Sequence, residues 1–132
     1  DSNVAQVFRN RLADGSPYTK LQSNTSSYVQ SDEDNNYLWN WVAPYYGGWE
    51  NIPENIRNAY DTYTCTGLPA GPISNPGLAA IQAALAPQCD EEVRDCYFFV
   101  TDLSGHYYYA KTYAEHQANC RKAAEVNKSL KN

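Results

Sequence analysis

The residues of this chain most able to do chemistry are two histidines, four cysteines and scattered carboxylates. Ser74, Asp102 and His106 are the residue types of a nucleophilic triad, in which a base activates a hydroxyl and an acid orients the base. The chain has no G-x-S-x-G turn to expose such a serine, so we interpret this combination as coincidence. From residue types alone, we expect His106 to be an ordinary strand histidine and His116 a surface residue of a helix.

The spacing of these residues gives little support to metal or cofactor chemistry. The cysteines form no CxxC pair and neither histidine stands at zinc-finger spacing, which argues against a zinc site. The sequence lacks a phosphate-binding glycine motif, and nothing around Lys111 suggests a pocket for pyridoxal phosphate. We therefore expect no metal and no cofactor.

An even number of cysteines in an acidic, tyrosine-rich chain is typical of an oxidising compartment. We expect a Cys89–Cys96 disulfide to close the acidic loop between them, and a Cys65–Cys120 disulfide as the second bridge. Closing so short a loop stabilises a fold by about 2–3 kcal/mol in the chain-entropy model. The alternative is four reduced, half-buried thiols.

Composition narrows the class of partner. The 132 residues include 12 tyrosines and 3 tryptophans and carry a net charge of −5, with no visible basic stripe, which argues against nucleic acid. Tyrosine, tryptophan and asparagine together suit sugars, which present apolar faces and polar rims. For the aromatic cluster from Trp39 to Trp49, we prefer a packed core over a glycan-stacking platform.

The first element expected to position these residues is a helix that begins at Ser2. Gly15 and Pro17 would terminate it. Its expected apolar face consists of Val4, Val7, Phe8 and Leu12. Residues 21–53 are expected to form short helices or turns. Residues 54–65 are expected to begin as a helical turn and to end extended at Thr62–Cys65.

A loop with three glycines and three prolines follows, from Gly67 to Gly77. Proline fixes φ and glycine opens conformations closed to other residues, so we expect one rigid shape. Asn75 is expected to cap the next helix and Pro76 to occupy its first position. The apolar stripe of that helix would be Leu78, Ile81 and Leu85, and Pro87 would end it.

The stretch CYFFVTDLSGHYYYA predicts a β-hairpin, because two aromatic, β-prone runs flank the turn DLSG. His106, Tyr108 and Ala110 would share one face of the second strand, and Tyr107 and Tyr109 the other.

Thr112 and Glu115 predict a capping box at the start of a last helix, which runs to about Lys128. The expected fold class is α+β, with a small antiparallel hairpin packed against several helices. We expect residues 1–132 to form a single domain.

Several segments together resemble one protein family. VAQVFRNRL, LQSN, AYDTYTCTGLPAGPISNPGLAAIQAALAP and YFFVTDLSGHYYYAKTYAEHQAN stand in the order typical of the YceG-like family, the MltG-type endolytic murein transglycosylases. The resemblance covers the chain except for about residues 26–58. It implies a bacterial lyase of cell-wall biogenesis on the extracytoplasmic face of the cell membrane. An N-terminal membrane anchor, missing from this chain, would hold it there.

The implied reaction cleaves MurNAc–GlcNAc bonds within peptidoglycan glycan strands and forms a 1,6-anhydroMurNAc end. A glutamic acid protonates the leaving oxygen, and the C6 hydroxyl of the substrate closes on C1. In the family this glutamate precedes the segment that matches VAQVFRNRL. Because the chain starts at Asp1, we expect a catalytic-domain fragment that lacks its general acid and is inactive. Glu115 matches the family's E-H pair and is better explained as a helix cap.

The resemblance also implies the wall of a glycan-binding groove. The implied substrate-binding residues are Gln22, Asn24, Tyr60, Asp61, Thr62, Tyr63, Asn75, His106 and His116. The matching loop residues are Gly67, Pro69, Gly71, Pro72, Pro76 and Gly77. Asn24 replaces the usual aspartate and Asp61 the usual asparagine. The loop would hold backbone amides beside the sugar, or it would merely shape the helix entry.

Two alternatives stand beside the transglycosylase. The first is a non-catalytic glycan-binding or scaffold module of cell-wall synthesis, suggested by the replacements at Asn24 and Asp61. The second is an aminodeoxychorismate lyase, a label this family has sometimes carried, which would need pyridoxal phosphate. The implied partners are glycan strands, with peptidoglycan synthases as further candidates and nucleic acid excluded.

Overall fold

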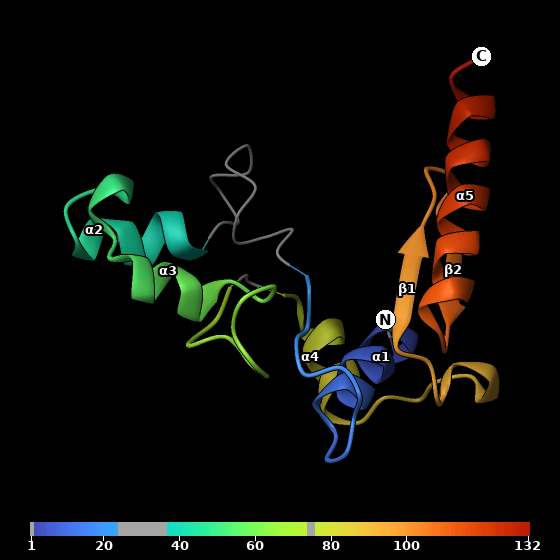
Figure 1. Cartoon of the computed structure of the whole chain (residues 1–132), viewed down its shortest axis with the longest axis horizontal. Coiled ribbons are helices and arrows are strands. Elements are labelled where there is room, and N and C mark those ends of the chain that lie inside the picture. Colours follow the sequence, from blue (N-terminus) through green and yellow to red (C-terminus); the bar gives the residue numbers. More distant parts are fainter. Residues whose placement is uncertain (1, 24–36, 74–75) are drawn as a thin grey trace. The chain divides into compact units, whose positions relative to one another are not determined.

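The computed structural model describes residues 2–23, 37–73 and 76–132 (Figure 1). They divide into two compact units. Asp1–Ala13 with Leu78–Asn132 form one, here called the hairpin unit, and Asp14–Gly77 form the other, here called the aromatic unit. Helices accompany a two-stranded antiparallel sheet in the described residues, which confirms the α+β class. None of the helices in these ranges is long and apolar enough to cross a bilayer.

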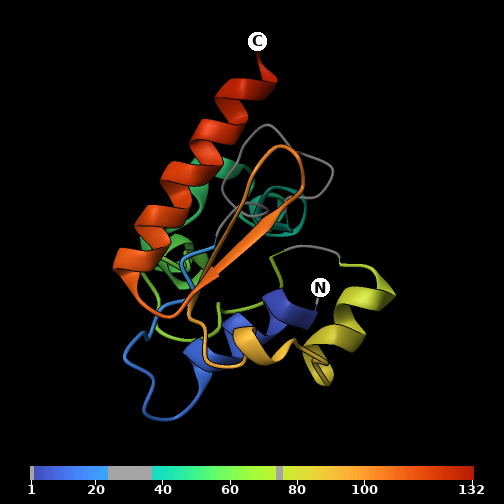
Figure 2. The same ribbon diagram turned by 90° about the vertical axis from the view of Figure 1, so that its right-hand side faces the viewer.

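Two strands organise the hairpin unit, β1 (Phe98–Thr101) and β2 (Tyr107–Ala110), and they pair antiparallel as predicted. Helix α5 (Tyr113–Leu130) packs along both strands, and Figures 1 and 2 show helix and hairpin side by side. The predicted alternation of faces is confirmed, because the rings of Tyr107 and Tyr109 stack on each other with centroids 6.2 Å apart.

Helix α5 begins with the predicted capping box. The hydroxyl of Thr112 accepts a hydrogen bond from Glu115 N at 3.2 Å, and the Glu115 carboxylate accepts one from Thr112 N at 3.4 Å. These bonds satisfy N–H groups that the start of a helix leaves without intrahelical partners. The Glu115 side chain is thus used as a cap, and the helix runs slightly beyond the predicted end at Lys128.

Helix α1 (Ser2–Leu12) supplies part of the core of the hairpin unit. The buried cluster consists of Val7, Val93 and Cys96, with Phe99 and Tyr109 packed against it. The predicted apolar face is wrong at its end, because Leu12 is exposed and Arg11 is buried instead. Arg11 can be buried because its Nε donates to the Tyr97 carbonyl at 2.6 Å and its guanidinium lies 4.8 Å from the ring centroid of Phe98.

Helix α4 (Leu78–Leu85) ends before Pro87, as predicted, but begins two residues later than expected. Pro76 and Gly77 therefore precede the helix rather than opening it. Asn75, the predicted cap, lies outside the described residues.

The predicted apolar stripe of α4 is also wrong. Leu78, Ile81 and Leu85 are exposed, and Ala83 is the buried residue. The reason is that α4 packs against α1, where a small side chain permits close approach. Arg9 of α1 also donates from Nη1 to the Leu85 carbonyl at 3.1 Å, which satisfies an acceptor at the end of α4.

The aromatic unit contains short helical pieces between residues 37 and 60, as predicted for the part of residues 21–53 that the structure describes there, whereas residues 24–36 lie outside it. These pieces are the π-helix η1 (Leu38–Val42), α2 (Ala43–Tyr45), the 3₁₀ turn η2 (Trp49–Asn51) and α3 (Glu54–Tyr60). Among the described residues of this unit, the buried apolar ones are Leu38, Ala43 and Ile52. The packed-core interpretation of the aromatic cluster is wrong for Trp39 and Trp41, which are 37% and 65% exposed. Trp49 is half-buried, and its ring centroid lies 5.6 Å from that of Trp39.

After α3 the chain turns, whereas Thr62–Cys65 was expected to extend. The Asp61 carbonyl accepts hydrogen bonds from Thr64 N at 2.9 Å and Cys65 N at 2.8 Å. The Asp61 carboxylate accepts two more, from Tyr63 N and Thr64 Oγ1, each at 2.9 Å. An aspartate that binds its own following backbone stabilises a turn, and this outweighs the β preference of the residues after it.

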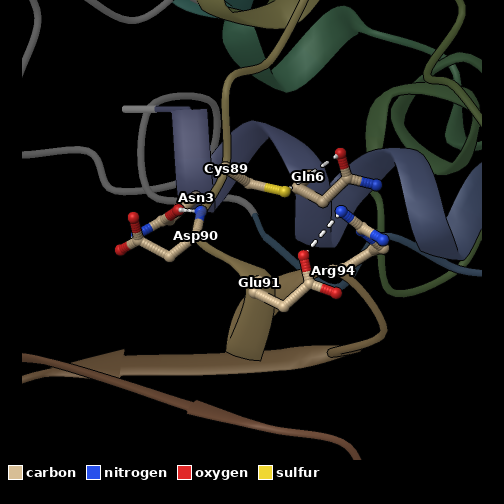
Figure 3. A network of polar contacts seen from close by, with 6 residues as sticks. All are labelled: Asn3, Gln6, Cys89, Asp90, Glu91 and Arg94. Carbon is tan, nitrogen blue, oxygen red and sulfur yellow. Dashed lines mark hydrogen bonds and ion pairs between the residues drawn. The ribbon is translucent and has the colours of Figure 1, made fainter.

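All four cysteines are free thiols, so neither predicted disulfide is formed and the alternative of reduced thiols holds. Cys96 donates its S–H to the Glu92 carbonyl at 3.3 Å, whereas the Cys89 Sγ faces Gln6 Oε1 at 3.7 Å (Figure 3). The two sulfurs of the first expected pair therefore have different partners. Cys65 belongs to the aromatic unit and Cys120 to the hairpin unit.

Candidate functional site

The turn after α3 is joined to the segment that carries Gln22. The Thr62 carbonyl accepts a hydrogen bond from Gln22 N at 3.1 Å, and the Thr62 hydroxyl accepts one from Ser23 N at 2.7 Å. Thr62 is fully buried, whereas the side chains of Gln22 and Tyr63 are exposed. The structure therefore brings the Gln22 segment beside the turn after α3, with Thr62 as the buried support beneath them.

Gln22 has an unusual backbone conformation, with φ at +54°. A non-glycine residue in the left-handed region is strained, and such strain is characteristic of functional sites. The backbone bond to Thr62 holds this conformation in place. Asn24, predicted beside it, lies outside the described residues.

The first half of the Gly67–Gly77 loop is fixed to neighbouring segments. Gly67, at φ +72°, donates its N–H to the Thr19 carbonyl at 2.8 Å, and Ala70 N donates to Ala59 O at 2.9 Å. Gly71 lies against Tyr60, since a Cβ there would be 2.9 Å from the tyrosine hydroxyl. Between Gly67 and Gly71, where these contacts lie, the loop therefore has the defined shape that its prolines and glycines predicted. Pro69 is half-buried, and Pro72, Pro76 and Gly77 are exposed.

His106 lies at the tip of the hairpin, where Asp102 organises the turn. The Asp102 carboxylate accepts hydrogen bonds from Ser104 Oγ at 2.5 Å and Tyr108 Oη at 2.9 Å, and from the backbone N–H of His106 at 3.1 Å. These hydrogen bonds lower the pKa of Asp102 to about 2, and the bond from the Ser104 hydroxyl contributes most to this shift. The imidazole of His106 is exposed and packs edge-on against the Tyr108 ring, with ring centroids 4.4 Å apart.

His116 is half-buried between α5 and the hairpin, not on the surface as its residue type suggested. Its ring stacks on Phe98 with centroids 5.1 Å apart, and its Nε2 lies 3.6 Å from Cys120 Sγ. Its Nδ1 is buried without a hydrogen-bond partner in the described part of the chain. Burial, with the nearby charge of Arg11, lowers the pKa of His116 and favours the neutral ring.

The hairpin register keeps the two histidines apart. Phe98, on which His116 stacks, pairs with Ala110 at one end of the hairpin, whereas His106 lies beyond the Thr101–Tyr107 pair at the other end. The strands separate these ends by about 10 Å at their normal rise. The two histidines therefore do not form a shared catalytic centre within the hairpin unit.

Sequence reasoning missed a pocket in the hairpin unit. Its volume is about 560 Å³, and it is lined by Asn3, Val4, Asp90, Glu92, Val93, Tyr107 and Tyr109. Asn3 and Asp90 bind each other twice, through Asn3 Nδ2 to Asp90 Oδ2 at 3.0 Å and Asp90 N to Asn3 Oδ1 at 2.9 Å (Figure 3). The alternation of residues in the strand predicted that Tyr107 and Tyr109 share one face. It did not predict that this face lies beside the turn at residues 90–93.

Carboxylates are plentiful in the described part of the chain, and most of them are exposed. Every glutamate that the structure describes has an exposed side chain. The described residues contain no group of three or more histidine, cysteine, aspartate or glutamate side chains placed to hold a metal ion.

Comparison with known proteins identifies one family that matches most of the chain. The model of the YceG-like family matches residues 1–122. An endolytic murein transglycosylase of Streptococcus pneumoniae serotype 2 (strain D39 / NCTC 7466) is 34% identical over 130 residues, which cover 96% of this chain and 20% of that protein. The endolytic murein transglycosylase of Bacillus subtilis (strain 168) is 32% identical over 130 residues, covering 98% of this chain and 30% of that protein.

The chain belongs to the YceG-like family. It spans between a fifth and a third of the length of the curated relatives it matches.

Proposed function

We propose that this chain is part of an endolytic peptidoglycan lytic transglycosylase. The observation that carries the proposal is its similarity, over nearly its whole length, to two proteins named endolytic murein transglycosylase. The proposed reaction cleaves the MurNAc–GlcNAc bond inside a glycan strand and leaves a 1,6-anhydroMurNAc end. The C6 hydroxyl of the substrate is the nucleophile, so no water is consumed.

The proton donor of this reaction must stay protonated near neutral pH, which requires a partly apolar surround. The described glutamates are exposed and do not meet this requirement. Asp102 is unsuitable for the opposite reason, since its hydrogen bonds stabilise the ionised form. We propose that the general acid is a glutamate upstream of Asp1 and that residues 1–132 alone are inactive.

The proposed glycan contacts lie on rigid supports. Gln22 is held by the buried Thr62, Tyr60 lies against Gly71, and Asp61 is hydrogen-bonded to Tyr63 within the turn. These contacts favour a fixed sugar-binding surface. Asn24 and Asn75 belong to the same proposal through their positions in the family motifs. In the hairpin unit, exposed His106 suits direct contact with substrate, whereas half-buried His116 suits positioning.

Location and partners follow from the same proposal. The protein would act on the extracytoplasmic face of the bacterial cell membrane, held there by an anchor upstream of this chain. Its substrate would be peptidoglycan glycan strands, and peptidoglycan synthases are candidate partners.

A non-catalytic glycan-binding module is the second candidate. The observation that favours it is the pair of replacements at Asn24 and Asp61, in a chain whose described glutamates are all exposed. Asp61 directs its carboxylate to its own turn, so the replacement changes the local turn as well as the surface.

The full-length protein, including the segment upstream of Asp1, tests these proposals with purified peptidoglycan. We expect mass spectrometry to detect muropeptides with anhydro ends, and we expect their release to stop when the upstream glutamate is changed to glutamine. Residues 1–132 alone should release none. Binding of glycan strands without any product would support the module instead, and a pyridoxal phosphate absorbance would favour an aminodeoxychorismate lyase.

A further inference from the structure

The proposed cleavage assigns no role to the pocket of the hairpin unit, which is partly open to solvent. Its wall combines the first turn of α1, the turn at residues 90–93 and one face of β2. Its residues are held from behind, because Val93 belongs to the buried core and Asp90 is bound twice by Asn3. Val93 and Asp90 are therefore held in place within this wall.

The charge of this wall is negative. Asp90 and Glu92 contribute carboxylates, and none of the described lining residues is lysine, arginine or histidine. The adjacent arginine is already paired, because Arg94 Nη2 contacts Glu91 Oε2 at 2.7 Å (Figure 3). The start of α1 adds a partial positive charge of about half a unit, which two full negative charges outweigh.

Aromatic rings provide the second part of the wall. Tyr107 and Tyr109 stack at an interplanar angle of 14°, and Tyr107 is 46% exposed. The faces of tyrosine rings attract cations, and carboxylates bind ammonium groups through charge-assisted hydrogen bonds. A neutral sugar would gain from the rings, but it would leave the charge of Asp90 and Glu92 uncompensated.

We propose that this pocket binds a primary ammonium group of a ligand. Resting on the proposed function, the ligand would be a cell-wall peptide attached to the glycan strand, with its free amino group between the tyrosine rings and the two carboxylates. The hairpin unit would then recognise the peptide through this pocket, while the residues proposed as glycan contacts, such as Gln22 and Tyr63, would bind the sugar chain. The pocket thereby distinguishes strands that carry amine-bearing peptides from bare glycan.

Saturation-transfer NMR on the full-length protein tests this inference with Nα-acetyl-lysine methylamide as the probe. We expect the probe to bind and its Nε-acetylated analogue, which keeps the same carbon chain up to Nε but carries no charge, to bind about ten-fold more weakly. Raising the salt concentration to about 1 M should weaken binding of the probe, because the Debye length falls to about 3 Å. Equal binding of the two compounds would overturn the proposal.

Variants locate the binding. Glu92→Gln should weaken the probe about three- to five-fold, the size expected for an exposed ion pair. Glu125→Gln is the matched control, since this exposed glutamate on α5 is not among the lining residues, and it should change nothing. Tyr107→Phe keeps the ring face and should retain binding, whereas Tyr107→Leu should lose it. Equal effects of Glu92→Gln and Glu125→Gln would place the probe elsewhere and contradict the inference.

A chitin oligosaccharide serves as the competing ligand. If it displaces nothing and the probe binds, the pocket is specific for the ammonium group. If it binds in a manner sensitive to Tyr107→Leu and the probe does not bind, the pocket takes sugar and the inference is wrong. Release of anhydro ends is a separate readout, so failure of the transglycosylase proposal is distinguishable from failure of this one.

Discussion

The imidazole of His116 lies nearly parallel to the ring of Phe98, at an interplanar angle of 21° and a centroid distance of 5.1 Å. Arg11 contacts the same phenyl ring through its guanidinium. The three residues come from α5, β1 and α1, so this stack joins three elements of the hairpin unit at one point. An added proton on His116 would place a second cation beside Arg11, which makes the stack sensitive to acid.

We predict that stability depends on pH through His116. Its pKa in the folded chain is below the ordinary value of 6.5, because of burial first and Arg11 second. The unfolded chain therefore binds the proton more readily, and the folded state loses stability as pH falls below about 6.5. His116→Phe, which keeps a stacking ring, should flatten this loss in urea unfolding measured at a series of pH values. His106→Phe is the control and should retain the slope; a slope unchanged in His116→Phe would refute the assignment.

Asp102 should produce a second, more acidic transition. Hydrogen bonds lower its pKa from 3.8 to about 2, so its stabilising effect is complete above the unfolded value of 3.8 and is lost as pH falls through about 2. Asp102→Asn should lower the thermal midpoint at neutral pH, and the difference from the parent chain should shrink towards pH 2. Circular dichroism melts at several pH values check this. Asp95→Asn, an exposed neighbour, should show no such convergence.

The close approach of Gly71 to Tyr60 predicts a steric effect. A methyl group at Gly71 would lie 2.9 Å from the tyrosine hydroxyl, so Gly71→Ala should destabilise the aromatic unit by about 1–3 kcal/mol. Gly77→Ala is the matched control, because nothing lies within 4 Å of a Cβ there. Tyr60→Phe removes the obstructing oxygen and leaves a ring carbon at 3.4 Å, so it should rescue Gly71→Ala in urea unfolding. Additive costs in the double variant would contradict this contact.

The capping box separates a structural role of Glu115 from a catalytic one. Thr112→Ala should destabilise the protein by about 1 kcal/mol, because the first turn of α5 loses its acceptor. Glu115→Gln preserves a capping side chain and should cost less, since glutamine also serves in this box. In the full-length protein, Glu115→Gln should still release anhydro ends. Loss of product with stability unchanged would instead make Glu115 a catalytic residue.

Local signals predicted the hairpin unit well in some places and failed in others. The hairpin, its alternating faces and the capping box depend on neighbours in sequence, so they could be read directly. The buried faces of α1 and α4 could not, because burial of Arg11 and Ala83 depends on which elements pack against them. An arginine is buried only where distant groups, here the Tyr97 carbonyl and the Phe98 ring, receive it.

The candidate site was likewise predictable only in part. Gln22 is hydrogen-bonded to Thr62, and the turn that carries Thr62 depends on the side chain of Asp61 rather than on β preference. The pocket beside Tyr107 was not predictable, because it joins residues separated by most of the chain. The disulfide prediction failed because an even cysteine count carries no information about the direction of each sulfur.

The placement of the tryptophans gives the molecule an internal optical label. All 3 of them, Trp39, Trp41 and Trp49, belong to the aromatic unit, and the hairpin unit has tyrosines but no tryptophan. Excitation at the red edge of the absorption band therefore reports on one unit, while near-ultraviolet signals from tyrosine report on both. Comparing the two signals during refolding reveals, without any attached dye, whether the units acquire their structure together or in succession.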